Sequence, residues 1–158
     1  MKFKIIAIIL TALIATSCSS IPSHKRMASA IEGYELPKYP EEGKAIVYMV
    51  RPSSAAFLVG FSVYVDEKET KAYMGKNGAK KYIYFNLEPG EHYIISKAEN
   101  TAKTFVKAEA GDIIFIEQQA RMGILFARNS VFRIDDTKGT YLVKRLKEGK
   151  SRRTDVEE

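Results

Sequence analysis

The chain has 158 residues, of which 46% are hydrophobic and 28% charged, with a formal net charge of +6. This length suits one domain, and the composition excludes the collagen-like, coiled-coil and polytopic membrane classes. A single Cys excludes an internal disulfide and a cysteine-based zinc site, and two His residues are too few for a His-rich metal site. We therefore expect no cofactor and no metal.

The N-terminus has the pattern of an export signal. Two lysines within residues 1–4 precede an uncharged run over residues 5–16. That run is too short for a bilayer core, which needs about 20 residues, but it fits the apolar region of a secretory signal peptide. We predict that residues 1–17 are a signal peptide that is removed.

The only Cys stands at the expected cleavage position. The segment from Ile14 to Cys18 resembles the lipobox of bacterial lipoproteins, in which the Cys thiol receives a diacylglycerol and cleavage leaves the Cys first. Ala15 stands where Leu is usual, and Ser17 replaces the commoner Gly or Ala. Ordinary signal peptidase cleavage is the alternative. We predict lipidation of Cys18, with palmitate among the acyl chains, and Ser19 in place of Asp favours outer-membrane sorting.

Residues 18–43 are predicted to be a lipidated tether. The stretch 19–40 contains three prolines and many polar residues, and it lacks a clean hydrophobic period. A short helix between Arg26 and Tyr34 is the alternative, because Met27, Ile31 and Tyr34 would share one face.

Residues 44–147 are predicted to be a mainly β domain, an antiparallel β-sandwich of about seven or eight strands with a short C-terminal helix. The apolar residues of 44–51 lie on both faces, which is typical of a central strand. Asp135 is expected to cap a helix that ends near Leu146, with Gly139 weakening it. Residues 148–158 are predicted to be a disordered tail. The predicted strands are 44–51, 61–66, 70–74, 81–87, 92–99, 102–108, 112–119 and 130–135.

Four segments resemble one known family. They are an opening strand that ends in Arg51-Pro52, a strand 63–66 that ends in Asp66, and turns at 87–92 and 110–112. Together they are similar to a family of small bacterial lipoproteins that is known only as a domain of unknown function. The resemblance covers residues 44 to about 147. It implies a β-sandwich on a lipid anchor, and it implies no particular activity.

No catalytic motif is present. The sequence lacks a Gly-x-Ser-x-Gly elbow, a His-Glu-x-x-His pair and a Walker loop, and His92 is expected to be a surface or packed residue. We expect a protein that is not an enzyme. Export removes nucleic acid as a partner for the basic C-terminal end, which is either a solvated tail or a contact for anionic headgroups.

An apolar segment follows the strand at 112–119, where a polar connector would be expected. Its side chains either cap the open end of the sandwich or form a partner surface. The loop after Pro52 contains Phe57, Leu58 and Val59, and these side chains likewise either cap the sandwich or form a partner surface. The candidate partner-surface residues are Met122, Ile124, Leu125 and Phe126.

These observations predict a lipid-anchored protein of the bacterial cell envelope that faces the periplasm. The expected function is a non-catalytic binding or interaction module, with the membrane reached through the acyl chains and an envelope protein or cell-wall polymer as partner. The sequence does not indicate an oligomeric state. The alternative is a small-ligand or glycan-binding domain that uses the tyrosines Tyr48, Tyr64, Tyr82, Tyr84 and Tyr93.

Overall fold

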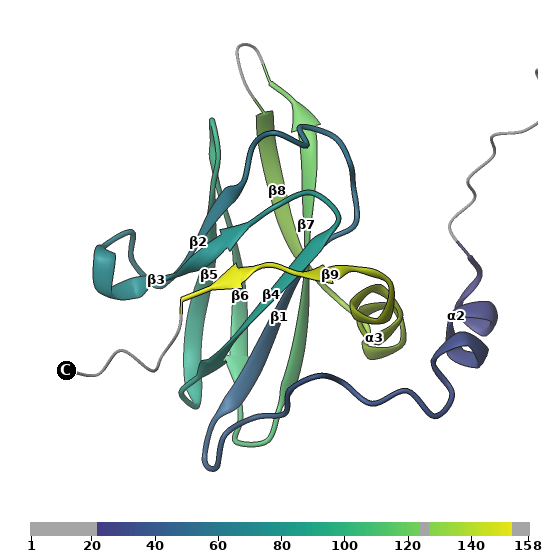
Figure 1. The fold of residues 1–158 in the computed structure, drawn as a ribbon. Coiled ribbons are helices and arrows are strands. Elements are labelled where there is room, and N and C mark those ends of the chain that lie inside the picture. The colour runs from purple at the N-terminus through teal and green to yellow at the C-terminus, as the bar shows by residue number, and fades with distance from the viewer. Residues whose placement is uncertain (1–21, 124–126, 153–158) are drawn as a thin grey trace, which may run out of the picture.

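The computed structural model describes residues 22–123 and 127–152, without the side chain of Met122. Two five-stranded sheets pack face to face, as predicted for a β-sandwich (Figure 1). The first sheet has the order β8-β7-β1-β4-β9 and the second the order β10-β3-β2-β5-β6. No helix in the described part of the chain is long and apolar enough to span a bilayer.

The strands and helices run in this order along the chain. They are α2 (His24–Ile31), β1 (Ala45–Arg51), β2 (Phe61–Val65), the 3-10 turn η1 (Thr70–Ala72), β3 (Tyr73–Asn77), β4 (Lys81–Leu87), β5 (Gly90–Lys97), β6 (Thr101–Ala108), β7 (Ile113–Met122), β8 (Ala127–Ile134), α3 (Asp136–Arg145), β9 (Lys147–Glu148) and β10 (Lys150–Ser151).

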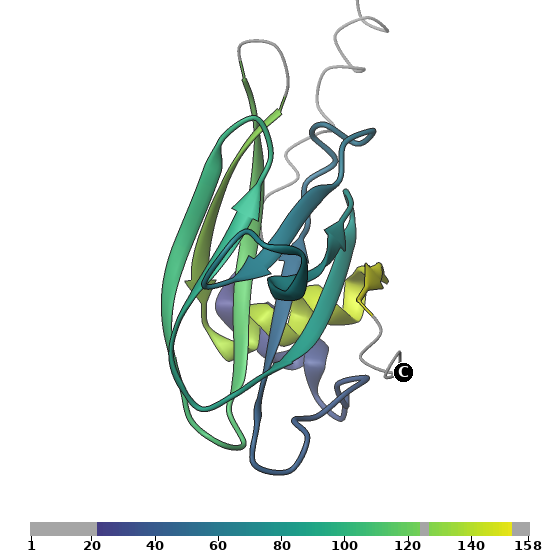
Figure 2. The same cartoon turned by 90° about the vertical axis from the view of Figure 1, so that its left-hand side faces the viewer.

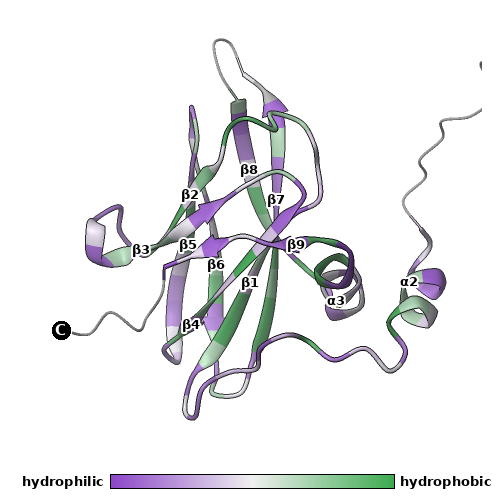
Figure 3. Ribbon diagram, in the orientation of Figure 1, coloured by the Kyte–Doolittle hydropathy of each residue, from purple (hydrophilic) through white to green (hydrophobic). Residues whose placement is uncertain are grey.

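Strand β1 is central, as its two-sided apolar pattern predicted, and all seven of its residues are buried. Val47 and Met49 face the core between the sheets, whereas Ile46, Tyr48 and Val50 face a second apolar cluster under α3. Figure 3 shows β1 and the first part of β7 mostly in green. One strand therefore supplies side chains to both cores.

Most strand pairs are antiparallel, as predicted, but two are not. β1 pairs parallel with β7, and β4 pairs parallel with β9. A parallel neighbour needs a long crossover connection, and here the five strands β2 to β6 lie between β1 and β7 in the chain. Strand periodicity carries no information on such a distant pairing.

Two segments differ from the expected tether and tail, the first of them in the way that the alternative of a short helix near 26–34 described. Residues 24–31 form α2, which packs against α3; Met27 is buried, and Lys144 Nζ donates to the Ala30 carbonyl over 2.6 Å. Near the other end, residues 147–151 form β9 and β10. Both segments are ordered by partners far away in the sequence, which composition does not reveal.

Helix α3 covers the outer face of the first sheet. Its start agrees with the prediction, because the Asp135 side chain accepts the Lys138 backbone N–H over 3.0 Å. The α3 residues Tyr141 and Val143 are buried. Figure 2 looks onto the second sheet, and both helices lie behind it. The outer face of the second sheet thus has neither α2 nor α3 over it, and only the short turn η1 projects on that side in the described part of the chain.

Candidate functional site

Most of the residues predicted as sites lie outside the part of the chain that the structure describes. Cys18, Ile124, Leu125 and Phe126 are among these, and of Met122 only the backbone is described, as the last residue of β7. Lipidation at Cys18 and the partner surface at 122–126 therefore stay predictions. The described residues instead bring two other features to the surface.

The first feature depends on Arg51, the last residue of β1, whose side chain is fully buried. Its guanidinium lies 3.9 Å from the centre of the Phe61 ring. Nη1 donates to the Val59 carbonyl over 2.6 Å and to the Asn77 carbonyl over 3.3 Å. Nη2 donates to the carbonyls of Ala55 and Ala56 over 2.9 and 3.0 Å.

These bonds explain how a cation is kept in the interior without an acidic partner. Burial lowers the pKa of the Arg51 guanidinium from its ordinary value, but an arginine stays charged in proteins. Four carbonyl dipoles and one aromatic face replace most of its water, while the buried Nε has no hydrogen-bond partner among the described residues. Because three of the four carbonyls belong to residues 55–59, the guanidinium fixes the shape of that loop.

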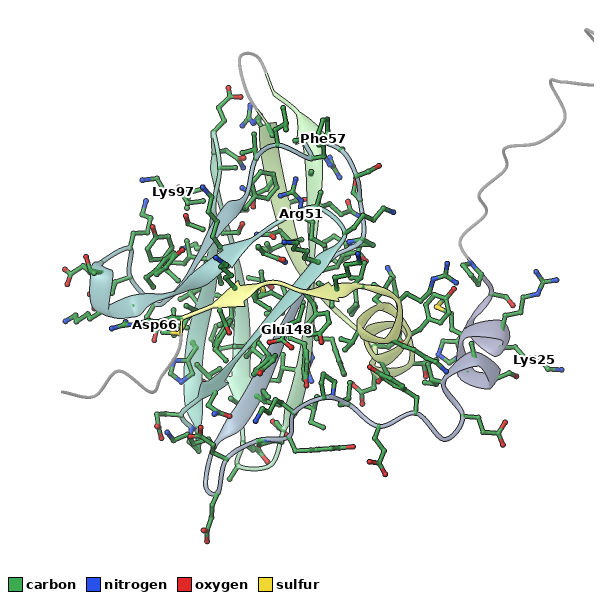
Figure 4. All side chains as sticks on the ribbon, viewed as in Figure 1. Lys25, Arg51, Phe57, Asp66, Lys97 and Glu148 are labelled. Carbon is green, nitrogen blue, oxygen red and sulfur yellow. The ribbon has the colours of Figure 1, made fainter. Side chains whose placement is uncertain are left out.

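The loop presents large apolar side chains to solvent. Phe57 is 72% exposed and Leu58 is 84% exposed, and Val59 is partly exposed. Ala56 has a φ of 52°, which is unfavourable for a residue other than glycine and is held here by the bond from Arg51. Figure 4 shows Arg51 and Phe57 at the same end of the sandwich. An ordered loop with exposed apolar residues is typical of a contact surface.

The second feature is the outer face of the second sheet. Cross-strand pairs place Tyr64 beside Tyr73 and Ile95, and Tyr93 beside Phe105. Tyr93 is 44% exposed and Phe105 is 50% exposed. A shallow depression at one end of this face is lined by Val59, Gly60, Ser62, Tyr64, Lys97, Ala98, Glu99 and Ala127.

The five tyrosines predicted for a ligand site fall into two groups. Tyr48 and Tyr82 are buried and Tyr84 is half-buried, and all three belong to the cluster under α3. Burial raises the pKa of Tyr82 to about 12. Only Tyr64 and Tyr93 reach the outer face of the second sheet. The structure therefore does not bring the predicted set together.

His92 is held at both ring nitrogens. Nδ1 lies 2.8 Å from Asp66 Oδ2, and Nε2 lies 2.9 Å from the Glu88 carbonyl oxygen. Asp66 Oδ1 accepts the Tyr93 backbone N–H. With both nitrogens engaged, His92 joins the end of β2 to the turn before β5 and has no free nitrogen for a metal or a substrate. This agrees with the expectation of a packed histidine.

The described residues contain no group of three His, Cys, Asp or Glu side chains placed to hold a metal ion. Sequence reasoning named the Arg51-Pro52 pair as a family motif but did not foresee that the guanidinium is buried. The one sequence signal for a buried guanidinium was the position of Arg51 directly after the apolar run 45–50.

Comparison with known proteins identifies the family. Residues 41–132 match the model of a family described as "Protein of unknown function (DUF2846)". The chain belongs to this family. The matched range begins just before β1 and ends in β8, so it includes Arg51, the exposed loop and the His92–Asp66 pair. No curated protein matches the chain.

Proposed function

We propose that this member of the DUF2846 family is a lipid-anchored protein of the bacterial envelope that acts by binding a protein partner. The N-terminal sequence supports the anchor: a charged start, a short apolar run and a lipobox-like segment that ends in Cys18. Two or three acyl chains give stable attachment where one is marginal. The body would then lie outside the bilayer, at the periplasmic face of the outer membrane.

The observation that carries the binding role is the loop held by Arg51. Exposed Phe57 and Leu58 lose apolar hydration whenever a partner covers them. Because the loop is already fixed by hydrogen bonds to its backbone, little ordering entropy is lost on binding. The partner surface predicted from the sequence at Met122, Ile124, Leu125 and Phe126 remains part of this proposal.

The anchor is tested by labelling cells with radioactive palmitate. Label is expected in the wild-type protein, which partitions into detergent, and not in the Cys18→Ala variant. Label in the variant, or none in the wild type, would reject the lipid anchor.

The loop is tested by Phe57→Asp, with Tyr39→Asp as the matched control, since Tyr39 is also exposed. Both charges are solvated in the free protein, so each variant should change the free energy of unfolding by about 0.5 kcal/mol or less. Phe57→Asp should abolish crosslinks to the partner in intact cells, because the buried charge would lack a counter-charge. Equal crosslinking of both variants would reject the loop as the contact.

A further inference from the structure

The outer face of the second sheet has the composition of a binding surface rather than of a solvated one. Of its two sheets, the protein covers the first with α3, whereas on the outer side of the second only the short turn η1 projects in the described residues (Figures 1 and 2). The side chains at the paired positions of this outer face are Lys150, Lys76, Tyr73, Ser62, Tyr64, Glu91, Tyr93, Ile95, Lys97, Thr101, Lys103, Phe105 and Lys107.

Charge at these paired positions is almost all positive, although Glu99 lines the depression at one end of the face. Five of these positions are lysines, and Glu91, opposite Lys107, is the one acidic residue among them in the ranges described. None of the five lysines forms a salt bridge within those ranges, whereas Lys44, Lys71 and Lys138 elsewhere do. One row across the sheet joins Lys150, Lys76, Ser62 and Lys97. Within the described ranges, these lysines thus have no acidic partner and are suited to an anionic ligand.

The aromatic side chains lie beside these lysines. Tyr64 and Tyr73 meet edge to face with ring centres 5.4 Å apart, and Tyr93 and Phe105 do so at 5.6 Å. Lys103 Nζ lies 4.5 Å from the centre of the Tyr93 ring. Ile95 between them is 6% exposed. The rings are therefore fixed by contacts with one another and still offer surface to solvent.

We infer that this face binds an anionic polysaccharide, and the inference rests on the proposed location in the cell envelope. A sugar ring has an apolar face of C–H groups that packs on an aromatic ring, and its carboxylates or phosphates pair with lysines. A strand-based face is extended, which suits a chain-like ligand. Lipid insertion favours strongly protruding apolar side chains, and among the described residues Phe57 and Leu58 in the loop are more exposed than Tyr93 and Phe105 on this face.

Binding is tested with a fluorescent oligogalacturonate, a chain of uronic acids, by anisotropy on the purified full-length protein in mild detergent. Lys97→Glu and Tyr64→Ala should each weaken binding by about tenfold, the first by charge repulsion and the second by lost ring contact. Lys25→Glu and Tyr39→Ala are the matched controls and should leave the affinity unchanged. Figure 4 shows Lys25 and Lys97 on opposite sides of the molecule.

Three further ligands distinguish sugar recognition from plain charge attraction and from membrane binding. Neutral maltohexaose should bind much more weakly than the uronic acid chain, and equal affinity would overturn the role of the lysines. If polyphosphate binds as tightly as the uronic acid chain, and Tyr64→Ala does not change its affinity, the face attracts anions by charge alone. That result would overturn sugar recognition. Phosphatidylglycerol vesicles that compete through Lys97 would show a membrane surface instead. Because these assays depend neither on Cys18 lipidation nor on Phe57, their failure would leave the proposed function standing.

Discussion

Arg51 is a buried cation whose partners are carbonyl oxygens and an aromatic ring. Buried charges usually have a charged partner, because desolvation is costly. Here the guanidinium geometry takes the place of a charged partner, since its fork of N–H groups reaches four carbonyls at once. A lysine has three donors at one point and cannot span the same set.

We expect Arg51→Leu to lower the free energy of unfolding by about 3 kcal/mol, because it leaves buried carbonyls without donors. The stability of Arg51→Lys should fall between those of the wild type and the Leu variant. Urea unfolding measures the effect, and proteolysis within residues 53–60 should become faster in both variants. A Leu variant as stable as the wild type would mean that the loop is held by other contacts.

Asp66 gives a prediction on pH. Burial raises the pKa of its carboxyl, but hydrogen bonds from His92 and from the Tyr93 backbone outweigh that effect, so the pKa lies below its usual 3.8. A pKa that is lower in the folded state stabilises the fold at pH values above the usual pKa. This contribution is lost as the pH falls through the lowered pKa.

The Asp66→Asn variant should therefore be less stable than the wild type at about pH 6, and the difference should vanish in strong acid. Since the carboxylate is half-exposed, we expect about 1 kcal/mol or less at that pH. Chemical unfolding at several pH values between these limits measures it. A difference that persists unchanged in acid would show that the Asp66 charge is not responsible.

At the scale of elements, local pattern predicted the strands well where side chains alternate, as in β4 from Lys81 to Leu87. It failed at β3, because the predicted strand 70–74 stops before Gly75, whereas β3 runs from Tyr73 to Asn77. In the structure Gly75 is inside β3, with a φ of 139°, because the backbone of β10 passes so close that a Cβ would lie 2.9 Å from the Lys150 carbonyl oxygen. The reason for this glycine is a contact with a strand about 75 residues later.

Gly139 in α3 is a second glycine whose reason is a contact that local sequence pattern does not reveal. Helix propensity alone favours Ala there by about 1 kcal/mol, and the sequence suggested a weakened helix. In the structure the glycine faces the Phe115 ring, and a Cβ would overlap it. The missing side chain lets the helix approach the sheet.

We therefore expect Gly139→Ala to destabilise the fold by about 2 kcal/mol through overpacking, against the direction of helix propensity. Adding Phe115→Leu should recover part of the loss by making room. Thermal unfolding of the single and double variants measures both. A stabilised Gly139→Ala variant would show that the α3–β7 contact adjusts without strain.

For the whole molecule, the sandwich was predictable because strand periods and turns are local features. The sequence could not predict which tyrosines are buried under α3 and which reach the second sheet, because that depends on which sheet face α3 covers. The exposed loop could be suspected from Phe57, Leu58 and Val59, but its order depends on a buried guanidinium that no local pattern reveals. The sequence thus pointed to this loop but left open whether its apolar side chains are buried or exposed.

The binding role is tested most directly by placing a photocrosslinking amino acid at position 57 in intact cells. If the loop held by Arg51 binds a protein partner, we expect one discrete protein adduct at position 57. That adduct should be absent when the same group replaces exposed Tyr39, and it should be lost when Arg51→Leu releases the loop. No adduct at position 57, or the same adduct at both positions, would contradict a binding role for the loop.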